Sequence, residues 1–242
     1  MNIPLKRFFL FSIFLLPLTM SGEVTAKSEQ AARQASDYDS RELAGWEVHL
    51  DHSLQNQDLE KKALALLEKN LTEIKTLFEK SPKIIAELQD VPIWITEGAA
   101  LHGAAYHPSR DWLKNNQRVP EMARSIEIQS ASDFINWAPT QPAMILHELA
   151  HSYHHRHFNF QQADITAAFK AAVASKKYEK VKHHNGKEQR HYALTNEKEY
   201  FAETTEAYFL KNDFTPFNKS ALKKFDQKGY DMIEKVWQVQ RK

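Results

Sequence analysis

The chain has 242 residues, a formal net charge of +1 and no cysteine. A charge this close to zero produces no large electrostatic field that would favour nucleic acid, so we expect no nucleic-acid partner. Without cysteine the chain forms no disulfide, and we expect its stability to come from a packed core, a bound metal ion, or both.

Residues 1–26 have the pattern of a secretory signal peptide. Lys6 and Arg7 precede an apolar run over residues 8–18, and small residues lead to a cleavage position after Ala26. The apolar run is too short for a stable transmembrane span. We therefore expect a secreted or periplasmic protein without stable membrane insertion. An uncleaved membrane anchor is the alternative, because the whole segment is rather apolar.

Residues 27–45 are predicted to be a flexible polar leader. Up to residue 41 this segment is rich in Ser, Gln and Ala and poor in large apolar side chains. Such a segment buries too little surface to offset the entropy lost on ordering. We expect one folded domain over residues 46–242, a length that suits a single domain of ordinary size.

Three segments are predicted to be β-strands. Apolar and polar side chains alternate in the segments 46–51 and 91–95, and a third candidate spans 124–129. A stretch of small residues over 98–105 lies between the second and third strands and is expected to be a loop.

Four segments are predicted to be helices. Apolar residues recur at spacings of three and four over residues 59–78. A second helix is expected to begin near Thr140, with Pro142 in its first turn, where a missing N–H costs nothing. Further helices are expected from residue 161 onward and over 196–211. With no internal repeat, the chain is predicted to be α+β, with a small mixed sheet and a mainly helical C-terminal half.

The helix after Thr140 contains the sequence His-Glu-Leu-Ala-His. Four residues separate His147 from His151, so both imidazoles face the same side one turn apart and can bind one ion. Zinc prefers such nitrogen ligands in a tetrahedron, with one position left for water in a catalytic site. Glu148 can act on that water as general base. A chance pair of exposed histidines is the alternative, but the apolar flanks indicate a buried helix, where unpartnered imidazoles are costly.

The sequence offers two candidates for a third ligand. Residues 147–157 read HExxHxxHxxH, which resembles the metzincin signature with His157 as ligand. That signature has glycine where this chain has His154, because the chain must turn there with positive φ. The other candidate is Glu199, one helical turn before Glu203. Glu199 would complete the ligand set, and Glu203 would accept the far N–H of a ligand histidine.

Other acidic and histidine side chains are weaker candidates. Glu197 is followed four residues later by Phe201, which cannot act as an acceptor, and Glu206 is expected on a solvated acidic face. His155 lies ~12 Å along the helix axis from His147, too far for both to bind one zinc ion. The remaining histidines near these segments are expected at the surface: His154, His155, His183 and His184.

The segment 192–203 reads Tyr-Ala-Leu-Thr-Asn-Glu-Lys-Glu-Tyr-Phe-Ala-Glu. It resembles the corresponding segment of the anthrax lethal factor-like zinc metallopeptidases, a gluzincin-type family that pairs an HExxH helix with a downstream glutamate. The resemblance covers residues 145–210 and implies a zincin-like peptidase domain, without the toxin's activity or substrates. It implies the following roles: zinc ligands His147, His151 and Glu199, base Glu148, outer acceptor Glu203, and a phenol near the metal, Tyr192.

Together these patterns predict a secreted endopeptidase with one zinc ion, acting on peptide or protein substrates. We expect an edge strand within 98–106 or 124–129 to bind the substrate as an added strand. Two alternatives remain. One is a non-catalytic metal- or peptide-binding protein on a peptidase fold, since fold does not fix function. The other is a zinc amidase that acts on cell-wall peptides.

Overall fold

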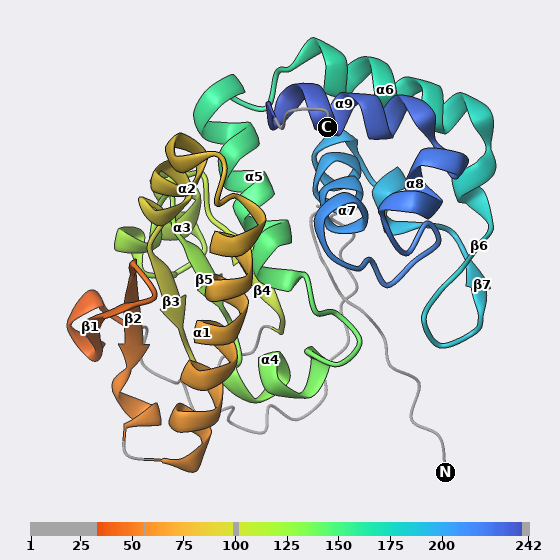
Figure 1. The fold of residues 1–242 in the computed structure, drawn as a ribbon. Coiled ribbons are helices and arrows are strands. Elements are labelled where there is room, and N and C mark those ends of the chain that lie inside the picture. The colour runs from red at the N-terminus through yellow and green to blue at the C-terminus, as the bar shows by residue number, and fades with distance from the viewer. Residues whose placement is uncertain (1–32, 56, 99–101, 239–242) are drawn as a thin grey trace, which may run out of the picture. The chain divides into compact units, whose positions relative to one another are not determined.

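A mixed β-sheet forms one layer of the fold (Figure 1). The computed structural model describes residues 33–55, 57–98 and 102–238, and in these residues five strands pair in the order β1-β2-β3-β5-β4. The central strands β2, β3 and β5 are parallel, whereas β1 and β4 are antiparallel to their neighbours and form the two edges. The strands are β1 (Tyr38–Leu43), β2 (Trp46–Asp51), β3 (Ile93–Ile95), β4 (Ala104–Tyr106) and β5 (Ile126–Ile128).

The three predicted strands are confirmed as β2, β3 and β5. Alternation in β2 has the expected effect, because Trp46, Val48 and Leu50 are all fully buried while Glu47 is exposed. The Trp46 indole also donates a hydrogen bond to the carbonyl of Leu88 at 2.9 Å, which satisfies its buried N–H.

The predicted flexible leader is wrong for its last part, because β1 lies within it. β1 pairs with β2 along all six residues. Tyr38 packs edge-on against Trp94 with ring centroids 4.9 Å apart, and Arg33 forms an ion pair with buried Asp51. Backbone pairing and cross-strand contacts can hold an edge strand that has few apolar side chains, which composition does not reveal. The folded domain therefore begins before residue 46, while residues 1–32, including the predicted signal peptide, lie outside the described residues.

Helices cover the sheet and form the C-terminal half, which confirms the α+β class. None of the helices in the described residues has the length and apolar character needed to cross a membrane. In chain order the helices are α1 (Asp58–Leu77), α2 (Pro82–Gln89), α3 (Arg110–Asn115), α4 (Ala131–Trp137), α5 (Met144–Phe158), α6 (Ala163–Ser175), α7 (Glu197–Phe209), α8 (Lys219–Phe225) and α9 (Gln227–Val236). A small hairpin, β6 (Val181–Lys182) and β7 (Glu188–Gln189), lies between α6 and α7.

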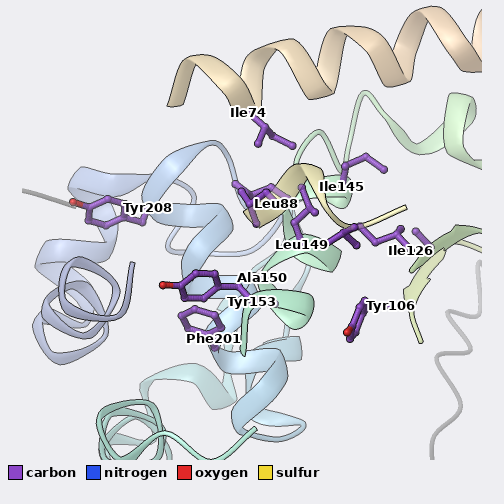
Figure 2. Close-up of a cluster of buried hydrophobic side chains, with 14 of the residues drawn as sticks. Ile74, Leu88, Tyr106, Ile126, Ile145, Leu149, Ala150, Tyr153, Phe201 and Tyr208 are labelled. Carbon is purple, nitrogen blue, oxygen red and sulfur yellow. The ribbon is translucent and has the colours of Figure 1, made fainter. Parts of the chain in front are cut away.

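Helix α5 joins the two halves, because it packs against β4 on one side and α7 on the other (Figure 1). Figure 2 shows Ile145 and Leu149 of α5 among apolar side chains that include Ile126 of the sheet, and Tyr153 near Phe201 of α7. Each of these side chains is buried. The helix begins at Met144, later than predicted, and Pro142 lies in the turn before it.

The end of α5 differs from a metzincin helix. The helix continues through His154 to Phe158, and the left-handed turn comes only at Asn159 and Phe160, with φ of 46° and 58°. The amide of Asn159 still bonds to the carbonyl of His155 at 2.8 Å, as in a helix C-cap. His157 therefore remains on the helix instead of turning back toward His151.

His154 is fully buried, and the expectation that it lies at the surface is wrong; it is also wrong for His183, which is buried as well. The ring of His154 lies 5.3 Å from that of Phe160 and 5.4 Å from that of Phe201, and neither ring nitrogen has a hydrogen-bond partner. Burial in this apolar setting, with nearby positive groups, lowers the pKa of His154 to about 4. The imidazole is therefore neutral at physiological pH and acts as a core side chain.

His154 predicts acid-sensitive folding. In the unfolded chain the imidazole of His154 binds a proton near pH 6.5, whereas in the folded chain it does so only near pH 4. The free energy of unfolding therefore falls as the pH drops from about 6.5 to about 4. The loss is on the order of 3–3.5 kcal/mol, because the pKa falls from 6.5 to about 4 and each pKa unit corresponds to about 1.4 kcal/mol. Urea unfolding at several pH values should show a flatter dependence for His154→Leu than for the wild type. Parallel curves for the two proteins would contradict this assignment.

Candidate metal centre

Three predicted ligand atoms converge between α5 and α7. The Nε2 atoms of His147 and His151 lie 3.1 Å apart, and Glu199 Oε2 lies 3.2 Å from the first and 3.3 Å from the second. These three residues are one of the groups whose side chains can hold a metal ion. We call them the donor triangle. Each of the three side chains is mostly but not completely buried.

The size of the donor triangle fits a small tetrahedral ion. In a tetrahedron with metal–ligand distances of ~2.0–2.1 Å, neighbouring donor atoms lie about 3.3 Å apart. The three observed separations, 3.1, 3.2 and 3.3 Å, are close to that edge length. The triangle supplies three corners, and the fourth is left for a water molecule or substrate.

Local structure fixes Glu199 in the first turn of α7. The side chain of Asn196 caps this helix and accepts hydrogen bonds from the amides of Lys198 and Glu199 at 2.9 and 3.1 Å. This cap holds the backbone that carries the third donor, and α7 in turn packs along α5. The ligand position therefore depends on a local cap and on helix packing together.

The pKa shifts within the donor triangle favour a negatively charged Glu199 and a positively charged His147. Burial would raise the pKa of Glu199, but the adjacent imidazoles of His151 and His147 outweigh it and hold that pKa far below its usual range. Burial also opposes protonation of His147, yet its bonds to Glu199 and Glu206 raise its pKa well above the usual value. The pocket thus favours positive charge between the imidazoles and the carboxylate.

Glu148 follows His147 in the sequence, and its side chain is buried. Its Oε2 accepts a hydrogen bond from the backbone N–H of Tyr106, at the end of β4, at 2.8 Å. Burial raises the pKa of Glu148, and His147 and His151 partly offset that rise. One carboxylate oxygen is therefore anchored to the sheet, and the pKa moves toward the range of a general base.

Glu206, and not Glu203, makes the close contact with the far nitrogen of His147. Glu206 Oε1 lies 2.6 Å from His147 Nδ1, whereas Glu203 Oε1 lies 3.9 Å away. The expectation that Glu206 lies on a solvated face is wrong, because it is buried. The spacing Glu199, Glu203, Glu206 follows one face of a helix at i, i+4 and i+7, and this signal could have identified the third member.

Glu203 is instead part of a buried polar cluster behind the centre. Its Oε2 accepts a hydrogen bond from the amide of Asn212 at 2.7 Å, and the same amide lies 3.3 Å from Glu206 Oε2. Burial and repulsion from Glu206 raise the pKa of Glu203 well above its usual value. Asn212 is fully buried and supplies neutral donors to both carboxylates, a role that the sequence did not suggest.

The alternative ligands lie elsewhere. His157 pairs with Glu87 of α2, with Nε2 and Oε2 2.9 Å apart. Because α5 stays helical, His157 points about 120° away from His151 around the axis. Glu197 accepts a hydrogen bond from Thr166 of α6 at 2.8 Å. The structure therefore brings Glu199, and neither alternative, to the two imidazoles.

Two other predicted residues have clear positions. Tyr192 begins a short 3₁₀-helix (Tyr192–Leu194) that packs against α7, and its side chain is partly buried. Its role near a metal stays a prediction. His155 is one turn beyond His151, and its Nδ1 lies 2.9 Å from the hydroxyl of Tyr106, so its side chain contacts the end of β4.

Comparison of the chain with protein-family profiles, curated proteins and solved structures gives no match.

The donor triangle predicts which substitutions abolish metal binding. Glu199→Ala should reduce Zn²⁺ affinity by more than the ~10–100-fold typical of an outer-sphere partner, because two imidazoles alone leave the ion poorly defined. His157→Ala, which removes the pair with Glu87 and the ring contact with Tyr153 but no member of the donor triangle, should leave affinity unchanged. Competition with a chromophoric chelator measures both. Loss of zinc in His157→Ala with retention in Glu199→Ala would restore the metzincin-like ligand set.

The contact between His147 and Glu206 yields a second prediction. Glu206→Ala should lower Zn²⁺ affinity ~10–100-fold, because His147 loses the acceptor that fixes its tautomer and orientation. Glu203→Ala should weaken metal binding less, since Glu203 stands farther from that nitrogen. Glu206→Gln, whose amide oxygen can still accept, is the matched control and should retain more affinity than the alanine variant. An equal effect of the two alanine substitutions contradicts the assignment.

Proposed function

We propose that this chain is a zinc-dependent hydrolase of peptide bonds. The observation that carries the proposal is the donor triangle, whose separations of 3.1–3.3 Å suit a tetrahedral ion, next to a buried and anchored carboxylate, Glu148. A purely structural zinc site closes its fourth corner with a protein ligand and has no use for a base. A set of three donors leaves one position of a tetrahedral ion for water or substrate, and together with Glu148 it favours catalysis over simple metal storage.

The residues divide the chemistry as follows. Zinc at this position would supply Lewis acidity, which polarises the scissile carbonyl and lowers the pKa of a nearby water molecule. Glu148 takes a proton from the attacking water and passes it to the departing nitrogen. Because Tyr106 N–H holds Oε2, the carboxylate cannot rotate freely, and Oε1 is the oxygen that carries the proton. Glu206 faces Nδ1 of His147, which would leave the Nε2 lone pair of His147 available to bind the ion.

Strand β4 is the best candidate for substrate binding. Of the two segments expected to offer an edge strand, the one ending at residue 129 forms β5, which is enclosed between β3 and β4. β4 forms an edge of the sheet in the described residues, and its last residue, Tyr106, contacts the proposed base. An extended peptide could pair with this edge and place its carbonyl near Glu148.

Three further proposals follow from the sequence. The segment 192–203 supports membership of the lethal factor-like metallopeptidases, and that resemblance assigns Tyr192 to the developing oxyanion or the leaving group. Residues 1–26 support export to the periplasm or the medium. Peptide or protein chains are the proposed substrates, with cell-wall peptides as a subset that the same chemistry would serve.

The proposed base predicts a specific loss. Glu148→Gln should retain bound zinc and the folded state but lose hydrolysis by at least about 100-fold, because the amide can bond to water without taking its proton. Mass spectrometry of a peptide library incubated with the protein measures cleavage. Glu121→Gln, an acid-to-amide change at an exposed position, is the matched control and should cleave normally. Undiminished cleavage by Glu148→Gln would remove this residue from the mechanism.

A further inference from the structure

A second group of metal-binding side chains lies at the β6–β7 hairpin. Ligand atoms of His183, His184 and Asp213 all lie within 4.8 Å of one another. We propose that these three residues bind a second divalent ion of the zinc type, separate from the donor triangle. The proposal is independent of hydrolysis, because it concerns only this group of two imidazoles and one carboxylate, ligands that suit such ions.

The spacing of His183 and Asp213 is that of two metal ligands. Buried histidine–carboxylate hydrogen bonds in this structure are short: 2.6 Å for His147 with Glu206 and 2.8 Å for His107 with Glu127. In contrast, His183 Nε2 and Asp213 Oδ2 lie 3.3 Å apart, although both side chains are buried. This separation is long for a charge-assisted hydrogen bond but matches the edge of the donor triangle and the ~3.3 Å edge of a zinc tetrahedron.

The hairpin turn brings the two histidines together. The amide of His183 bonds to the carbonyl of Lys187, and the amide of Gly186 bonds to the carbonyl of His183, both at 2.9 Å. Gly186 has φ of +80°, which closes this tight turn at no steric cost. As a result the imidazoles of His183 and His184 lie 4.0 Å apart between ring centroids. Consecutive residues in an extended strand would point to opposite faces instead.

The backbone holds the third ligand against the turn. The amide of His184 bonds to the carbonyl of Asp213 at 2.7 Å, and the amide of Thr215 bonds to the carbonyl of Lys182 at 2.8 Å. His183 also forms an isolated bridge with Phe214. The ligands are thus fixed on paired backbone segments before any ion arrives, which reduces the entropy cost of binding.

Burial and charge also favour a cation at this place. His183 and Asp213 are buried, and His183 Nδ1 has no hydrogen-bond partner, whereas His184 is exposed and gives an ion a path from solvent. Asp213 also adds negative charge beside the buried carboxylates Glu203 and Glu206. A divalent ion on Asp213 would offset that repulsion, as bound cations often do.

The proposed ion would act as a cross-link. It would join the hairpin to the segment that begins at Asn212, whose amide contacts Glu203 and Glu206 behind the metal centre. A chain without cysteine has no disulfide for this purpose. Ion binding at this second group should therefore stabilise the folded state by mass action.

Metal stoichiometry tests the proposal. Purified protein is loaded with Zn²⁺, freed of excess ion by gel filtration and analysed by atomic emission. The wild type should hold two ions, and His184→Ala should hold one, with the same folded spectrum because His184 is exposed. Asp213→Asn, which keeps the shape of the side chain, should also hold one. His52→Ala, at an exposed histidine paired with Asp39, is the matched control and should hold two.

Cross-variants separate this proposal from the proposed function. His151→Ala should lose the other ion, and the double variant with His184→Ala should hold none. Zinc should raise the thermal midpoint of His151→Ala but not that of the double variant. One ion in the wild type and still one in His184→Ala would overturn the second site, as would two ions in both. Both results are independent of the Glu148→Gln test, because that test measures peptide cleavage and not metal content.

Discussion

The packing of α5 against α7 is the constraint on which the rest of the structure depends. A donor triangle with edges of 3.1–3.3 Å forms only if Glu199 on α7 sits at a fixed distance from two imidazoles on α5. Trp237, after α9, helps to set that distance. Its ring stacks on Tyr153 of α5 at 4.3 Å and on Phe201 of α7 at 5.8 Å. Its indole N–H also donates a hydrogen bond to the hydroxyl of Thr205 of α7. Trp237 therefore contacts both α5 and α7, the two helices that carry the donor triangle.

The same packing forces several charges into a poorly hydrated space. Unpaired buried carboxylates are strongly destabilising, so each needs a partner. Glu148 receives the Tyr106 amide, Glu206 faces His147, and Glu203 receives the Asn212 amide. These partners come from the sheet, from α5 and from the segment after α7. The polar cluster therefore ties together elements that are far apart in the sequence.

The sheet contributes to the site through its edge. β4 carries the amide that holds Glu148, and the following residue, His107, bonds to buried Glu127 of β5 at 2.8 Å. Arg118 also contacts Glu127 from the loop after α3. The contact between His107 and Glu127 therefore ties the end of β4 to β5. A substrate that pairs with β4 would therefore meet an edge that is bonded both to the sheet and to the proposed base.

The sequence by itself determined the elements whose cause is local. Alternation in β2, periodicity in α1, and the spacing of His147 and His151 on one helical face depend only on neighbouring residues, and the structure confirms them. The choice between His157 and Glu199 depended on tertiary structure, because it required knowing where α5 ends and how α7 packs on it. The spacing of Glu199, Glu203 and Glu206 already placed all three on one helix face, but only the tertiary structure could show that Glu206 is the one that contacts His147. Only the tertiary structure, too, could show that His154 is buried and that β1 forms a sheet edge. These outcomes depend on contacts between distant segments, which no local pattern encodes.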